Sequence, residues 1–313
     1  LQDYLASEVA VRATRLVLLA EVANAYLRVA ADRSLLAIAR DTAATAERSV
    51  ELTRARLAGG IAPRSDLGQA ETVLAQAHSD LANLTTIVAQ GRNALELLVG
   101  APVNEAELAP SIESMDEMLA ELPAGLDSYI LLRRPDVLQA EYQLRSANAL
   151  IGAARAAFFP RISLTAITGL ASTALSSLFT AGAFSWTVQP SLLLPIFDGG
   201  ANQGNLEASI ALREVATARY QKSIQTAFRE VADALARRGT IDNQFEAQTR
   251  LEAAARDNYE LANARYRQGI ESYLSTLDAQ RTLYSARRSL VLTWLVRAEN
   301  LIELYRSLGG DAA

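Results

Sequence analysis

The 313-residue sequence contains no cysteine, and its one histidine is His78. The missing thiols exclude disulfides, thiolate catalysis and most structural zinc sites. No run of about 18 apolar residues occurs, so the sequence predicts no transmembrane helix. The net charge of -5 gives no support for nucleic-acid binding. With no phosphate-binding loop and no nucleophile elbow, we predict that the chain is not an enzyme and needs no metal or cofactor.

Proline (8 residues) and aromatic residues (6%) are also scarce, and the alanine-rich remainder favours helix. The periodicity predicts four long helices, each followed by glycine, which commonly ends a helix. At about 1.5 Å per residue the third of them would be about 100 Å long, a coiled-coil length. The predicted helices span residues 1–57, 66–99, 201–268 and 272–308.

These helices form two hairpins that repeat each other. Adding 209 to a position in the first hairpin gives the matching position in the second, as in Glu21 and Glu230 or Gly60 and Gly269. The register runs without a gap over about 100 residues. Two repeats are too few for a solenoid, so a closed oligomeric ring is the better interpretation.

The segment between the hairpins has a different period. Apolar residues alternate with polar ones from Phe184 to Ile196 and, more briefly, from Ile162 to Ala166. This pattern indicates a β-hairpin with strands of about ten residues, the length and pattern of transmembrane β-barrel strands. An amphipathic hairpin on a soluble core is the alternative. In lipid, a single hairpin would have to join others in a closed barrel, which implies an oligomer.

The sequence therefore predicts five regions. They are a first helical hairpin (1–99), a loop-rich connector (100–132), a short helix (133–160), a transmembrane β-hairpin (161–197) and a second helical hairpin (198–313). Within the connector, the stretch from Asn104 to Leu126 is acidic. The region also carries Pro102, Pro110 and Pro123. Because the first repeat lacks a preceding short helix and β-hairpin, we expect an N-terminal part before residue 1 that trimer formation requires.

Three segments closely resemble the outer-membrane channels of tripartite efflux systems, the TolC-type family. They are LLRRPDVLQAEYQLRSANALIGAARAAFFPRISL, SLLLPIFDGGANQGNLEAS and ARYRQGIESYLSTLDAQRTLYSARRSLV. The resemblance is nearest to NodT-like lipoproteins that serve RND pumps in multidrug resistance. It implies a mainly α fold of long antiparallel coiled-coil hairpins, an α-barrel, together with β-barrel strands completed by trimerisation. The implied protein lies in the outer membrane of the Gram-negative envelope and spans into the periplasm.

The resemblance also implies functional residues beside the two helix turns. Gate-type residues match Tyr266, Asp278, Arg281 and Asp66, although Glu271 and Ser275 depart from the family pattern. The alternative is structural, with Asp66 capping a helix and Tyr266 packed in a coiled-coil core. Adaptor contacts would fall on Arg56, Gly59, Gly60, Arg265 and Gly269, where turn chemistry is an equal explanation. The expected lipid-facing residues are Phe184, Trp186, Val188 and Leu192.

The expected function is a passive exit duct for drugs or other small molecules. Its partners would be two further copies of the chain, a periplasmic adaptor, an inner-membrane RND-type pump and outer-membrane lipids. The alternative is a periplasmic coiled-coil scaffold or an adaptor. An adaptor should carry a lipoyl-like β-domain, which this sequence lacks, and a scaffold would leave the alternating strands without a role.

Overall fold

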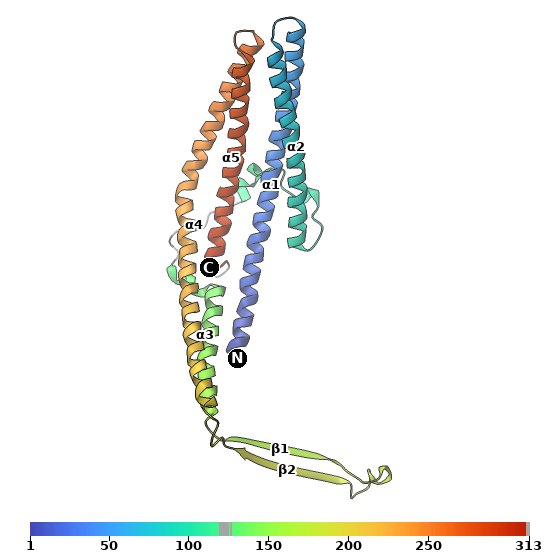
Figure 1. Ribbon diagram of the computed structural model, residues 1–313, viewed down its shortest axis with the longest axis vertical. Coiled ribbons are helices and arrows are strands. Elements are labelled where there is room, and N and C mark those ends of the chain that lie inside the picture. The colour runs from blue at the N-terminus through green and yellow to red at the C-terminus, as the bar shows by residue number, and fades with distance from the viewer. Residues whose placement is uncertain (119–124, 126, 311–313) are drawn as a thin grey trace. The chain divides into compact units, whose positions relative to one another are not determined.

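The computed structural model describes residues 1–118, 125 and 127–310 (Figure 1). These residues fall into two compact units, each described separately. The strand unit comprises Leu1–Ala10 and Asp136–Gln225, and the helical unit comprises Val11–Pro135 and Thr226–Ala313. Pro123 and Leu126 of the predicted connector, and residues 311–313 of the predicted second hairpin, lie outside the described residues.

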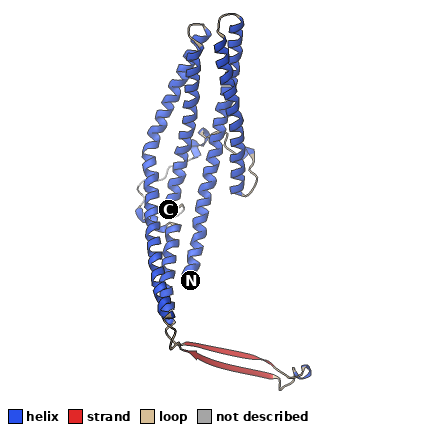
Figure 2. Cartoon of the chain, viewed as in Figure 1, coloured by secondary structure: helices blue, strands red, loops and turns tan. Residues whose placement is uncertain are grey.

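The predicted helices are confirmed to within about two residues at each end, as Figure 2 shows. No helix in the described part of the chain has an apolar stretch long enough to cross a membrane. Short 3₁₀ turns occupy part of the connector, which fits its predicted loop-rich character. The helices are α1 (Gln2–Ala58), α2 (Arg64–Val99), α3 (Pro135–Ala156), α4 (Ala201–Arg267) and α5 (Tyr273–Ser307).

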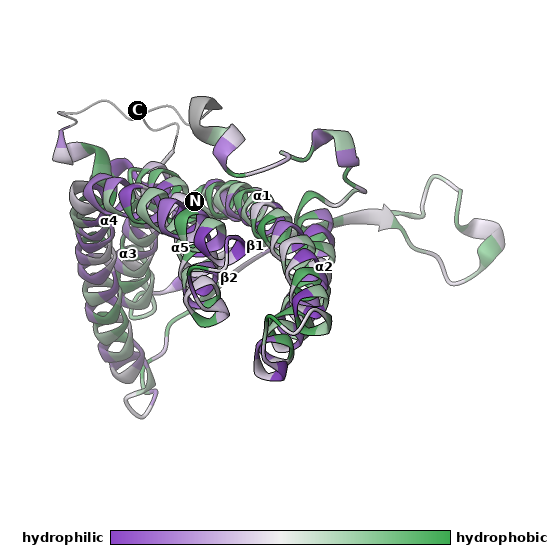
Figure 3. Cartoon of the chain, turned by 90° about the horizontal axis from the view of Figure 1, so that it is seen from above, coloured by the Kyte–Doolittle hydropathy of each residue, from purple (hydrophilic) through white to green (hydrophobic). Residues whose placement is uncertain are grey.

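The helical unit has its largest apolar core where α1, α2, α5 and the connector meet. Leu27 and Leu36 of α1, Leu84 of α2 and Trp294 of α5 are buried there together with Ile112 of the connector. Figure 3 shows apolar and polar residues interspersed along these helices. Burial of the apolar residues in this core stabilises the helices far more than intrinsic propensity does.

Polar contacts hold the connector against α1. The Tyr26 hydroxyl donates to the Glu107 carbonyl (2.9 Å) and accepts from the Ala109 N–H (3.0 Å). Ser34 accepts from the Ile112 N–H at 3.0 Å. Because the connector's own backbone forms few regular bonds, these side chains satisfy groups that would otherwise be buried without partners.

The strand unit pairs two ten-residue strands, β1 (Arg161–Leu170) and β2 (Phe184–Leu193), antiparallel and in register. In the same unit, α3 lies beside the first part of α4 (Figures 1 and 3), and Asn202 donates to the Ala157 carbonyl at 3.4 Å. Both strands have the predicted length of about ten residues, and the ladder ends where Leu193 pairs with Arg161, the first residue of β1. The predicted mainly α fold with one β-hairpin is confirmed.

Candidate functional site

The two helix turns have the same backbone geometry. At the first turn, residues 59–63, the Gly60 N–H donates to the Leu57 carbonyl (3.0 Å) and the Ile61 N–H donates to the Arg56 carbonyl (2.9 Å). This pair of bonds is the Schellman motif, which needs a left-handed residue, and Gly60 has φ of 71°. At the second turn, residues 268–272, the Gly269 N–H donates to the Tyr266 carbonyl and the Ile270 N–H donates to the Arg265 carbonyl, both at 2.9 Å.

Side chains beside the second turn pack into the first hairpin. Tyr266 is only 3% exposed, and its hydroxyl lies 3.2 Å from the Thr53 hydroxyl of α1. The ring centroids of Tyr266 and Tyr273 lie 5.3 Å apart. The guanidinium carbon of Arg56 lies 4.5 Å from the Tyr266 ring centroid. Val50, Ala70 of α2 and Leu277 complete this group, which we call the turn cluster. It joins α1 and α2 to α4 and α5 within the helical unit.

A tyrosine in the turn cluster stays protonated well above neutral pH. Burial raises the pKa of Tyr273, and the hydrogen bond from the Ser49 hydroxyl (3.2 Å) opposes that rise. Near neutral pH the Tyr273 hydroxyl is therefore neutral and remains the acceptor of this hydrogen bond.

The predicted adaptor-contact residues divide into two sets. Gly59, Gly60, Gly269 and Arg265 are exposed at the turns. Arg56 is half-buried, and its guanidinium donates to the Tyr266 carbonyl while covering the Tyr266 ring. Arg56 therefore has a structural task inside the chain that its repeat equivalent, Arg265, lacks.

The remaining predicted gate residues lie near the turns without joining one another. Asp278 and Arg281 are both exposed on α5, and no ion pair within the described residues includes either of them. Asp66 lies in the first turn of α2, where a carboxylate complements the helix dipole. The expectation that Asp66 caps this helix is wrong, because Pro63 occupies the N-cap and no side-chain cap bond forms.

The β-hairpin register gathers the predicted lipid-facing side chains on one face. Val188 pairs with Ala166, and Leu192 pairs with Ile162. The opposite face carries Thr165 paired with Gln189 and a hydroxyl contact of 2.7 Å between Ser163 and Ser191. Every residue of both strands is exposed in the single chain, including Trp186 at 69% and Phe184 at 62%.

Arg134 is a buried charged residue that the sequence analysis does not single out. Its side chain is 4% exposed, donates to the Ser307 carbonyl at 2.8 Å and pairs with Glu230 at 2.9 Å. Arg134 thus satisfies a carbonyl at the C-terminal end of α5, where the helix dipole favours a cation. Asp136, two residues further along the chain, lies in the first turn of α3. The His78 side chain is half-exposed, and its Nε2 lies 3.5 Å from a carboxylate oxygen of Glu47.

A family model described as outer membrane efflux protein matches residues 1–101 and 127–310. The chain is 45% identical over 310 residues to the probable efflux pump outer membrane protein TtgC of Pseudomonas putida. It is 41% identical over 309 residues to the cation efflux system protein CusC of Escherichia coli. Each match covers 99% of this chain, and the chain spans 64% of TtgC and 67% of CusC.

Solved structures give the same result. A membrane protein from Pseudomonas aeruginosa superimposes with a TM-score of 0.87 at 40% identity, covering 99% of this chain and 69% of that one. The open state of the Neisseria gonorrhoeae MtrE outer membrane channel gives a TM-score of 0.85 at 36% identity, again covering 99% and 69%. The chain therefore belongs to the outer membrane efflux protein family.

Proposed function

We propose that the protein is the outer-membrane exit duct of a tripartite efflux pump and conducts drugs or other small molecules passively. Three copies would each contribute β-strands to a closed barrel in the outer membrane and long helices to a tunnel through the periplasm. A periplasmic adaptor and an inner-membrane RND-type pump would complete the assembly. Relatives named as efflux pump outer membrane proteins support this proposal.

The observation that carries the proposal is the exposed two-faced β-hairpin. Ten cross-strand pairs sort the side chains of the ten-residue strands into a mostly apolar face and a mostly polar one. About ten residues per strand is enough to cross the hydrocarbon layer at the tilt usual in barrels. Among the described residues each strand pairs on only one side, so further strands would have to satisfy the remaining backbone groups in lipid. In this proposal, other copies of the same chain supply those strands.

The turn region would form the gate of the duct. In this proposal Asp278 and Arg281, which are exposed and form no ion pair within the residues that the structure describes, would meet their counterparts near the threefold axis. Tyr266 would act from inside the chain, because its buried contacts with Thr53 and Arg56 hold the second hairpin against the first. The exposed turn residues, with Asp66 beside them, would receive the adaptor. A closed state favoured by a few kcal/mol suffices for such a gate.

Single-channel conductance in planar bilayers tests the duct and its gate together. We expect the full-length protein to insert as a channel, and Asp278→Ala to raise its conductance by loosening the resting gate. Tyr266→Phe combined with Asp278→Ala should raise it further. Asp257→Ala is the control, since Asp257 is an exposed aspartate on α4 that lies farther along its helix from the second turn than Asp278 does. Asp242 is unsuitable as a control because it accepts from Arg297 at 3.0 Å.

Two outcomes would contradict different parts of the proposal. Absence of any channel activity from correctly folded protein would refute the duct. Wild-type conductance of inserted Asp278→Ala would instead place the gate elsewhere and leave the duct intact.

A second experiment tests the lipid-facing assignment. Val188→Arg would place a charge on the apolar face and should cost about 2–4 kcal/mol near the bilayer midplane. Gln189→Arg, one residue along the strand, should cost far less because its side chain would face water. The measurement is the yield of folded, membrane-inserted protein for the two variants. Equal yields would show that the face assignment is wrong.

A further inference from the structure

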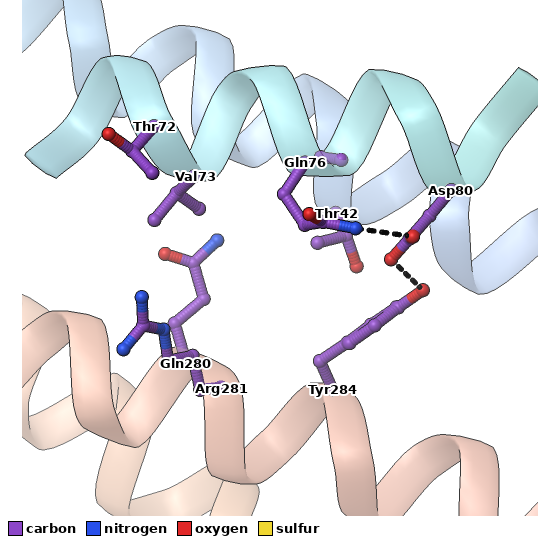
Figure 4. A pocket seen from close by; sticks show the side chains of 9 residues that line it. Thr42, Thr72, Val73, Gln76, Asp80, Gln280, Arg281 and Tyr284 are labelled. Carbon is purple, nitrogen blue, oxygen red and sulfur yellow. Dashed lines mark hydrogen bonds between the residues drawn. The ribbon is translucent and has the colours of Figure 1, made fainter.

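A small cavity of about 180 Å³ lies between α1, α2 and α5 in the helical unit (Figure 4). Val73 and Ala77 of α2 give it an apolar wall. Its polar lining includes Gln76, Asp80, Gln280, Arg281 and Tyr284. The hydrogen bonds already made by these side chains determine what kind of ligand the cavity can accept.

The carboxylate in this lining is already occupied. One Asp80 oxygen accepts from the Gln76 amide at 2.9 Å, and the other accepts from the Tyr284 hydroxyl at 3.0 Å, as the dashed lines in Figure 4 show. Burial and the neighbouring Asp80 carboxylate both raise the pKa of Tyr284, so its hydroxyl keeps the proton that it donates. Both oxygens of this carboxylate are thus engaged, although it keeps its negative charge, and in Figure 4 it lies at the other end of the lining from Arg281. An anionic ligand would therefore have to lie toward Arg281.

The uncommitted groups are donors. Gln280 is 7% exposed, and its buried amide nitrogen has no partner among the described residues. Figure 4 shows this amide pointing from α5 into the space between the helices, with the Arg281 side chain beside it. The Arg281 guanidinium lines the cavity and forms no ion pair within the part of the chain that is described. A buried N–H without an acceptor costs about 1–3 kcal/mol.

We propose that this cavity binds a small carboxylate. The two carboxylate oxygens would accept from the Gln280 amide and the Arg281 guanidinium, and a short alkyl chain would lie on Val73 and Ala77. The cavity has room for several water molecules and therefore for a short acid of about four carbons. The site lies inside one chain and shares Arg281 with the proposed gate, so binding is tested by a measurement that does not depend on conductance.

Isothermal titration calorimetry of the full-length protein in detergent, with butyrate as the probe, tests the proposal. We expect saturable binding, weakened at least about tenfold by Gln280→Met, which removes a donor to a charged acceptor. Arg281→Met should abolish binding, and Gln280→Glu should do so by repulsion. Arg250→Met is the matched control, since Arg250 is exposed on α4 and pairs with Glu246 outside this cavity. It should leave the affinity unchanged.

Butyramide has nearly the shape of butyrate without its charge and should bind at least about tenfold more weakly. Far-UV circular dichroism and the melting temperature check that each variant is folded. No saturable heat from butyrate with folded protein would overturn the proposal. Equal affinity for butyramide would overturn it too, as would an unchanged affinity for butyrate in folded Gln280→Met and Arg281→Met.

Discussion

The first and second turns have the same backbone and different side-chain surroundings. A shift of 209 residues carries the end of α1 onto the end of α4 and the start of α2 onto the start of α5. Yet Tyr266 is buried in the turn cluster, whereas its equivalent Leu57 is half-buried outside that core. Arg56 covers a tyrosine ring, whereas Arg265 is exposed. Local hydrogen bonding thus fixes both turns alike, and contact between the hairpins makes them different.

The largest expected effect comes from removing the buried tyrosine. Tyr266→Ala should lower the free energy of unfolding by about 3–5 kcal/mol, the usual cost of deleting a buried aromatic side chain. Leu57→Ala, at the equivalent position, should cost about 1 kcal/mol because its side chain is only half-buried. Chemical denaturation of the full-length protein in detergent measures both. Equal losses would mean that the two turns are equivalent in stability.

The next largest loss of stability is expected from replacing Arg134, which binds the C-terminal end of α5. Arg134→Met should cost about 3 kcal/mol, because it leaves Glu230 with one guanidinium fewer and the Ser307 carbonyl without its donor. The repeat equivalent of Glu230 is Glu21, which is exposed, so Glu21→Gln should be nearly neutral. Arg133→Met is the matched control, because Arg133 is the neighbouring arginine and, unlike Arg134, is exposed. A loss below about 1 kcal/mol for Arg134→Met would mean that its contacts with Glu230 and Ser307 contribute no more than an exposed ion pair does.

Glycine substitutions should show where the turns are alike. Gly60 and Gly269 have φ of 71° and 76°, and an added Cβ meets nothing closer than 3.6 Å at either. Alanine at either position should therefore cost about 1–2 kcal/mol, the penalty for a left-handed residue. Gly59→Ala is the control, since Gly59 has no positive φ. Melting temperatures that fall for one turn only would refute the equality.

The smallest effect concerns a single hydrogen bond. The Tyr266 and Thr53 hydroxyls lie 3.2 Å apart, so a double-mutant cycle of Tyr266→Phe and Thr53→Val should give a coupling of about 1 kcal/mol. The cycle removes both hydroxyls without changing the size of either side chain greatly. The first turn offers no such pair at Leu57. A coupling near zero would assign the stability of the turn cluster to packing alone.

Much of the fold followed from the sequence because its signals are local. Glycine at 60, 100, 269 and 309 marks helix ends, and the period of two in residues 184–193 marks a strand. The site was less predictable. Asp66 has the residue type of a cap, but Pro63 occupies that place. The sequence does not single out Arg134, because its buried ion pair with Glu230 joins positions 96 residues apart.

The sequence by itself determined the helices, the hairpin, their lengths and the repeat, because backbone hydrogen bonding, glycine conformation and apolar period act over a few residues. It also determined which strand residues share a face, since that follows from alternation alone. Only the tertiary structure decided that Tyr266 is buried and Leu57 is not, and that Arg56 and Arg265 differ. Only the packing of three helices created a cavity whose free groups are donors. The physical reason is that burial and partner choice depend on residues far apart in the chain, which no local pattern specifies.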